Sequence, residues 1–130
     1  MQLSLSATTF LVRDYDAAIA WFTQALRFTL VEDTPLPGGK RWVRVVAGQG
    51  PSCLLLAKAE GAVQEAAVGR AAGGRVAYFL HTDDFAASHA HMQKRGVRFH
   101  ETPRKEVYGT VAVFEDLYGN RWDLIEPAKV

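Results

Sequence analysis

The chain has 130 residues, of which 48% are apolar, enough for one compact domain or two small fused modules. Its 15 Lys and Arg side chains nearly balance 14 Asp and Glu side chains, so the charge predicts neither a nucleic-acid partner nor an anionic membrane. No apolar run approaches the roughly 20 residues that span a bilayer. The opening stretch lacks a signal-peptide pattern and the lone Cys53 cannot form an internal disulfide, so we expect a cytoplasmic protein.

The first part of the chain predicts a strand, a helix and three further strands. Ala7–Val12 reads as a strand, and Asp14 or Asp16 caps a helix that runs to about Leu26. Further strands are expected at residues 28–32, 41–47 and 53–57, because these segments are β-rich and the turns between them hold Pro and Gly.

The same order of elements recurs from Val76 onward, which indicates an internal repeat. Asp84 follows a predicted strand and caps the second long helix, as Asp14 does in the first half. Later strands are expected at residues 97–100, 110–115 and 121–126. We therefore interpret residues 1–130 as a single domain with module one at 1–58, an Ala- and Gly-rich linker at 59–74 and module two at 75–130. The linker is expected to hold a short helix around residues 62–68.

The clearest motif is the stretch Glu115–Pro127. It begins with the turn formers Asp116, Gly119 and Asn120. It ends in a strand in which Trp122 and Leu124 point one way and Asp123 points the other. This pattern resembles the closing strand of the vicinal oxygen chelate superfamily, the glyoxalase, bleomycin-resistance and extradiol-dioxygenase proteins. The resemblance implies an α+β fold in which two βαβββ modules form a curved, half-open sheet of eight strands, with helices outside and a cavity inside.

The resemblance also places a possible metal site. Metalloenzymes of that superfamily hold a divalent metal with one ligand from each of four strands. The corresponding positions here are Ala7, Leu54 or Leu55, Ala77 and Asp123. Only Asp123 can ligate, and one carboxylate does not hold a transition metal. We therefore expect no metal and no other cofactor, with a divalent metal bound by other ligands as the alternative.

The candidate catalytic residues are His81 and Asp123. Period two in the strand puts His81 on the same face as Ala77, which is the cavity face if the modules align as the resemblance implies. The two side chains then serve as a base and its orienting carboxylate, as two anchors for a polar ligand, or as part of a displaced metal site. Alternatively, His81 only bonds the turn that follows its strand.

Four further residues are candidates for substrate binding. Tyr108 can stack on a ligand and Arg104 can pair with an anion, although both also suit a solvated loop. Trp42 lies on a predicted strand and either packs or lines the cavity. Arg121 is the fourth candidate, and its alternative role is a structural ion pair with Asp123.

Together these features predict a metal-independent protein that binds a small organic molecule, either as a sequestering protein or as an enzyme that uses His81 and Asp123. The alternative is a metal-dependent lyase, isomerase or dioxygenase of glyoxalase type, and a third class is a regulatory module without chemistry. A near-neutral charge disfavours a cationic ligand such as bleomycin. Uncovered sheet edges and the resemblance predict a homodimer.

Overall fold

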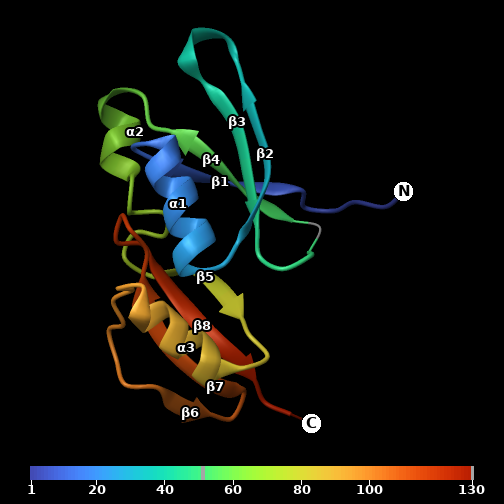
Figure 1. Cartoon of the computed structure of the whole chain (residues 1–130), viewed down its shortest axis with the longest axis vertical. Coiled ribbons are helices and arrows are strands. Elements are labelled where there is room, and N and C mark those ends of the chain that lie inside the picture. The colour runs from blue at the N-terminus through green and yellow to red at the C-terminus, as the bar shows by residue number, and fades with distance from the viewer. Residues whose placement is uncertain (51, 130) are drawn as a thin grey trace. The chain divides into compact units, whose positions relative to one another are not determined.

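The same order of elements, a strand, a helix and three strands, occurs in each half of the chain (Figure 1). The computed structural model describes residues 1–50 and 52–129. The first half consists of β1 (Ala7–Val12), α1 (Tyr15–Ala25), β2 (Thr29–Pro35), the 3-10 turn η1 (Pro37–Gly39), β3 (Arg41–Val46) and β4 (Cys53–Lys58). After α2 (Gly61–Ala67) come β5 (Val76–His81), α3 (Phe85–Lys94), β6 (Arg104–Glu106), β7 (Gly109–Glu115) and β8 (Arg121–Pro127). This order confirms the predicted α+β class with two βαβββ modules.

Unit 1, residues Met1–Val68, is a four-stranded mixed sheet covered by α1. Its strand order is β1-β4-β3-β2, with β1 parallel to β4 and the other pairs antiparallel. Of the two predicted candidates, Asp14 and Asp16, it is Asp14 that caps α1, because its carboxylate accepts the Ala17 N–H at 2.7 Å. Phe22 of α1 is fully buried, and its ring meets that of Phe10 on β1 edge to face at 5.1 Å.

Unit 2, residues Gly69–Val130, repeats this plan with the strand order β5-β8-β7-β6. Asp84 caps α3 by accepting the Ala87 N–H at 3.0 Å. Glu126 of β8 accepts the Phe85 N–H at 2.8 Å. This second bond satisfies another free N–H of the first helical turn and fixes the start of α3 beside β8.

The two sheets share one register. In unit 1, Leu55 of β4 lies between Thr9 of β1 and Arg44 of β3. In unit 2, Asp123 of β8 lies between Phe79 of β5 and Val113 of β7. Leu55 therefore holds in unit 1 the position that Asp123 holds in unit 2, which supports the repeat at the level of single residues.

The strand predicted at residues 97–100 is wrong. Phe99 makes only an isolated bridge to Phe114, and regular pairing with β7 begins at Arg104, in β6. The reason is a competing side chain, since the Glu101 carboxylate accepts the Val113 N–H at 2.8 Å and so occupies a donor of β7. Pro103, which has no N–H, then delays pairing further. β6 (Arg104–Glu106) thus lies where no strand was predicted, between the strands expected at residues 97–100 and 110–115.

The linker contains the predicted helix, which forms as α2 (Gly61–Ala67). The boundary between the two compact units falls between Val68 and Gly69, within the predicted linker. The interpretation of the chain as a single domain stays a prediction. In the described part of the chain, none of the helices has the length and apolar character needed to cross a bilayer.

Candidate functional site

The two faces of the unit 2 sheet differ in what covers them. A run of ring contacts leads from α3 to the sheet: His89 packs on Phe85 and on Phe99, and Phe99 packs on Phe114. Phe114 in turn stacks on Trp122 at 5.7 Å. Because strand side chains alternate, Asp123 points to the opposite face, which we call the open face. His89 is accordingly a packing residue of the helix-covered side.

The open face carries a large exposed aromatic ring beside a buried acid. Phe79 is 64% exposed although it is paired in register with Asp123. Asp123 is only 9% exposed, and its Oδ1 is buried without a hydrogen-bond partner in the part of the chain that the structure describes. An unpaired buried carboxylate oxygen is costly, so this side chain is not explained by the packing of the sheet.

The charge state of Asp123 reflects its surroundings. Burial raises the pKa of the Asp123 carboxyl above its ordinary value, whereas nearby Arg104 acts to lower this pKa and nearby Glu101 acts to raise it. The carboxyl can accept a hydrogen bond when it is ionised and donate one when it is protonated. It is therefore suited to hold a polar group of a ligand in either state.

Arg104 is less available for an anion than the sequence suggests. Its guanidinium donates to Glu101 at 3.0 Å and to Glu106 at 2.8 Å. It also donates to the Tyr108 hydroxyl at 3.3 Å. Two carboxylates thus balance one cation, and they raise the pKa of Arg104 further above its ordinary value. Tyr108 is half exposed, so its ring remains free to contact a ligand.

His81 and Asp123 lie on neighbouring strands, as predicted, but the register sets them apart. His81 pairs with Ile125, and the partner of Asp123 is Phe79. His81 is exposed. Within residues 1–50 and 52–129, His81 donates no hydrogen bond to the Asp123 Oδ1. The assignment of both as catalytic residues stays a prediction. Arg121 is also exposed. In the described part of the chain, Arg121 does not form the alternative ion pair with the buried Oδ1 of Asp123.

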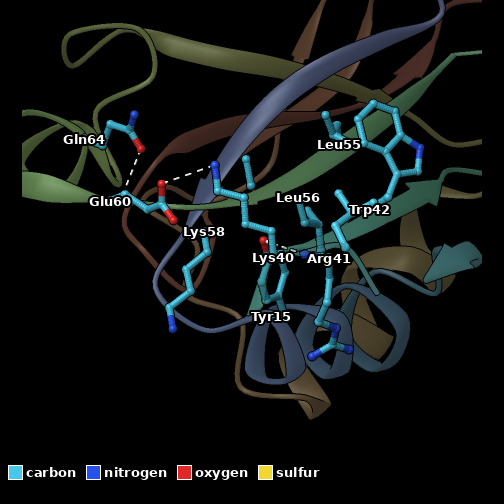
Figure 2. Close-up of a pocket in the computed structure, with 11 residues that line it drawn as sticks. Tyr15, Lys40, Arg41, Trp42, Leu55, Leu56, Lys58, Glu60 and Gln64 are labelled. Carbon is cyan, nitrogen blue, oxygen red and sulfur yellow. Dashed lines mark hydrogen bonds and ion pairs between the residues drawn. The ribbon is translucent and has the colours of Figure 1, made fainter. Parts of the chain in front are cut away.

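Trp42 belongs to unit 1. Its indole is 41% exposed on β3 and lines a pocket there (Figure 2). The neighbouring Arg41 is held by two carboxylates, those of Asp16 at 2.9 Å and Asp33 at 2.7 Å. Trp42 is therefore placed to contact a ligand, although the Arg41 cation beside it is already paired.

The residues at the metal positions implied by the resemblance do not fit a metal. Register places Leu55 where unit 2 has Asp123, and Leu55 has no ligating atom. Ala7 and Ala77 precede Thr9 and Phe79 by two residues on their strands and likewise lack ligating side chains. A lone carboxylate falls short of the three or four ligands that a transition metal requires.

Two features of this face were missed in the sequence. Phe79 was not singled out, although its period of two with His81 indicated the same face. Glu101 was not considered, and only the path of the chain brings it to both Val113 and Arg104.

Comparison with known proteins gives the family context. A sequence model of the Glyoxalase/Bleomycin resistance protein/Dioxygenase superfamily matches residues 4–124. An uncharacterized protein of Shewanella frigidimarina is 46% identical over 128 residues, which cover 97% of this chain and 95% of that protein. The crystal structure of UcmS2 superposes with a TM-score of 0.82 at 28% identity, covering 97% of this chain and 99% of the other. TnmS3, an antibiotic binding protein from Streptomyces sp. CB03234, gives 0.77 at 26% identity, covering 98% and 99%.

Proposed function

The chain belongs to the Glyoxalase/Bleomycin resistance protein/Dioxygenase superfamily, and from that premise we propose that it binds a small organic molecule on the open face of unit 2 without a metal. The observation that carries the proposal is the buried Asp123 Oδ1, which has no hydrogen-bond partner among the described residues. It lies beside the exposed ring of Phe79. A ligand with a hydroxyl or amine donor on an apolar, preferably aromatic, body would cover the ring, and its donor would satisfy the oxygen once the Asp123 side chain turns to meet it.

Sequestration is the role that we favour over turnover. TnmS3, one of the similar structures, is an antibiotic binding protein, so binding alone is a role that this fold supports. Catalysis by His81 and Asp123 would require an oriented base, and His81 is an exposed side chain paired with Ile125. We propose a sequestering protein that acts in the cytoplasm on a toxic compound or metabolite.

The metal-independent part of this proposal is tested by elemental analysis. Protein purified without an affinity tag or chelator should hold no stoichiometric Zn, Ni, Mn or Fe, because Ala7, Leu55 and Ala77 offer no ligands. One tightly bound metal per chain would contradict the proposal. That result would favour the metal-dependent lyase, isomerase or dioxygenase.

The binding part is tested with a panel of aromatic natural products that carry hydroxyl or amine groups. Equilibrium dialysis followed by mass spectrometry should identify a ligand for the parent protein. Phe79→Ser should weaken that ligand about tenfold, since it removes a stacking surface that is mostly exposed. Val63→Ser is the matched control, because Val63 is also an exposed apolar residue but lies on α2. Equal binding by both variants would place the ligand elsewhere.

We also propose that the protein is a homodimer. β2 is an edge strand of its sheet and exposes Leu30 and Val31, which is a feature that a partner subunit commonly covers. Light scattering at micromolar concentration should give about twice the chain mass, and Val31→Lys should lower it to the monomer mass. Val63→Lys, an exposed control on α2, should leave the dimer intact. A monomeric parent protein would refute the proposal.

A further inference from the structure

A second candidate binding site lies in unit 1, where β3 and β4 stop pairing. Their register runs from Val45↔Leu54 to Val43↔Leu56 and goes no further along β4. At the next hydrogen-bonding position of β3, the Arg41 N–H donates to the Tyr15 hydroxyl at 3.2 Å instead. The strands and the start of α1 thus enclose a pocket of about 250 Å³ (Figure 2).

The pocket has an apolar end and a charged end. Figure 2 shows Trp42 beside Leu55 at one end, with Lys40, Lys58 and Glu60 gathered at the other. The indole of Trp42 is 41% exposed, so a flat ring can pack against it. The volume is slightly below the roughly 300–1,000 Å³ of sites for drug-sized ligands, which points to a ligand of one or two rings.

Among the charged groups at this pocket, one cation stays outside the ion pairs. Lys40 forms an exposed ion pair with Glu60 at 3.4 Å, and Arg41 is balanced by Asp16 and Asp33. Lys58 has no ion-pair partner among the residues that the structure describes. One flexible ammonium at the rim is therefore left to meet an anion.

A fixed hydrogen-bond donor lies between the two ends. Tyr15 lines the pocket and is only 7% exposed. Its hydroxyl oxygen accepts the Arg41 N–H, while its own proton has no acceptor in the described part of the chain. A tyrosine hydroxyl can donate as well as accept, so this proton is available to a ligand oxygen.

We propose that this pocket binds a small aromatic carboxylate, with its ring against Trp42 and Leu55 and its carboxylate between the Tyr15 hydroxyl and the Lys58 ammonium. The aromatic wall, the buried donor and the free cation are complementary to the three parts of such a ligand. The site is built from unit 1 alone and does not depend on the function proposed for the open face of unit 2.

The probe for this site is 1-naphthylacetate, with the uncharged 1-naphthylacetamide as its matched control. The chain has three tryptophans, and Trp42→Phe assigns the indole N–H signal of Trp42 in a ¹H–¹⁵N NMR spectrum. Titration with the acid should shift that signal and saturate, and the amide should bind about tenfold more weakly because it lacks the charge that Lys58 recognises. No shift of the Trp42 signal, or equal affinity for acid and amide, would overturn the proposal.

Variants separate the cation from the hydroxyl. Lys58→Met should weaken the acid about tenfold and leave the amide unchanged, whereas Lys94→Met on α3 should change neither. Tyr15→Phe should also weaken the acid, and its thermal midpoint shows whether the loss of the bond from Arg41 has disturbed the fold. Because Lys58 is exposed, Lys58→Met tests the proposal even if Tyr15→Phe unfolds. Unchanged acid binding in Lys58→Met would refute it.

Phe79→Ser should bind the acid like the parent, which keeps this test independent of the open face.

Discussion

Asp116→Ala is expected to lower the free energy of unfolding by about 3–5 kcal/mol. The Asp116 carboxylate is buried and accepts four hydrogen bonds. Its Oδ1 accepts the N–H groups of Tyr118 at 2.9 Å and of Asn120 at 3.1 Å. Its Oδ2 accepts the Asn120 side-chain amide at 3.0 Å and the Trp122 indole N–H at 2.8 Å. Removing the carboxylate leaves these donors buried without partners, and each such donor costs free energy.

The loss should extend beyond the turn itself. Asn120, which Asp116 orients, accepts the Ala71 N–H at 3.0 Å through its own side chain. Gly69 packs so tightly on the Tyr118 carbonyl that a Cβ there would clash, and its φ is 78°. The turn therefore fixes the segment of residues 69–71 at the start of unit 2.

Urea denaturation of Asp116→Ala beside Asp83→Ala measures this effect. Asp83 is exposed, so its replacement should leave the unfolding midpoint nearly unchanged. Asp116→Asn should fall between the parent and the alanine variant, because its amide keeps one acceptor oxygen. A midpoint for Asp116→Ala equal to that of Asp83→Ala would show that the four bonds contribute little to stability.

The hydrogen bonds of Asp116 explain the role of the Glu115–Pro127 motif. The turn formers and Trp122 in the Glu115–Pro127 stretch are typical of the superfamily's closing strand, and here Asp116, Asn120 and Trp122 form one hydrogen-bonded structural cluster. The motif therefore identified the fold through residues that stabilise it. Asp123 lies in the same stretch, points to the open face and is the residue on which the proposed function rests.

Much of the fold was predictable because its signals are local. Ala7–Val12 forms the expected strand, and Asp14 and Asp84 cap the expected helices, since capping and periodicity depend on neighbouring residues. The failure of residues 97–100 to form a regular strand was not predictable in the same way. The pairing of this segment is interrupted by the Glu101 side chain, which reaches a backbone N–H 12 residues further along the chain.

The position of Asp123 in the candidate site was predictable for the same reason. Alternation along β8 placed Asp123 opposite Trp122, and its burial without a partner for Oδ1 agrees with the expectation that packing does not explain it. The pairing of Arg104 with Glu101 and Glu106 was not predictable, because it depends on where β6 begins. The sequence suggested a cation free to bind an anion, whereas the folded chain balances it with two carboxylates.

Asp123→Asn is expected to weaken binding of the ligand found on the open face about tenfold or more, while the protein remains folded with an unchanged or raised thermal midpoint. The binding loss follows if a donor of the ligand satisfies the buried Oδ1 as a charge-assisted bond in the parent. The thermal result follows because the buried Oδ1 has no partner among residues 1–50 and 52–129, and a neutral amide of the same shape removes the cost of burying the charge.

The stability difference between Asp123→Asn and the parent should change with pH in a defined direction. Burial raises the pKa of Asp123 in the folded protein, whereas in the unfolded chain an aspartate titrates near about 3.9. The folded state then binds the proton more tightly, so the parent loses stability as pH rises from the unfolded value through the folded one. The midpoint of Asp123→Asn relative to that of the parent should therefore rise over this window and level off above it. The charged groups that act on this carboxyl are Arg104, which lowers the pKa of Asp123, and Glu101, which raises it.

The opposite thermal result would identify a structural role. If Asp123 stabilises the sheet through Arg104, then Asp123→Asn should lower the thermal midpoint below that of the parent. Glu106→Gln is the control, since it removes one carboxylate from Arg104 on an exposed strand and leaves Asp123 intact. A large loss in Asp123→Asn with a small one in Glu106→Gln would contradict the proposed ligand contact. If Asp123→Asn instead keeps its thermal midpoint but loses ligand binding, the Asp123 carboxylate contributes to ligand binding. Its removal has then cost the sheet no stability.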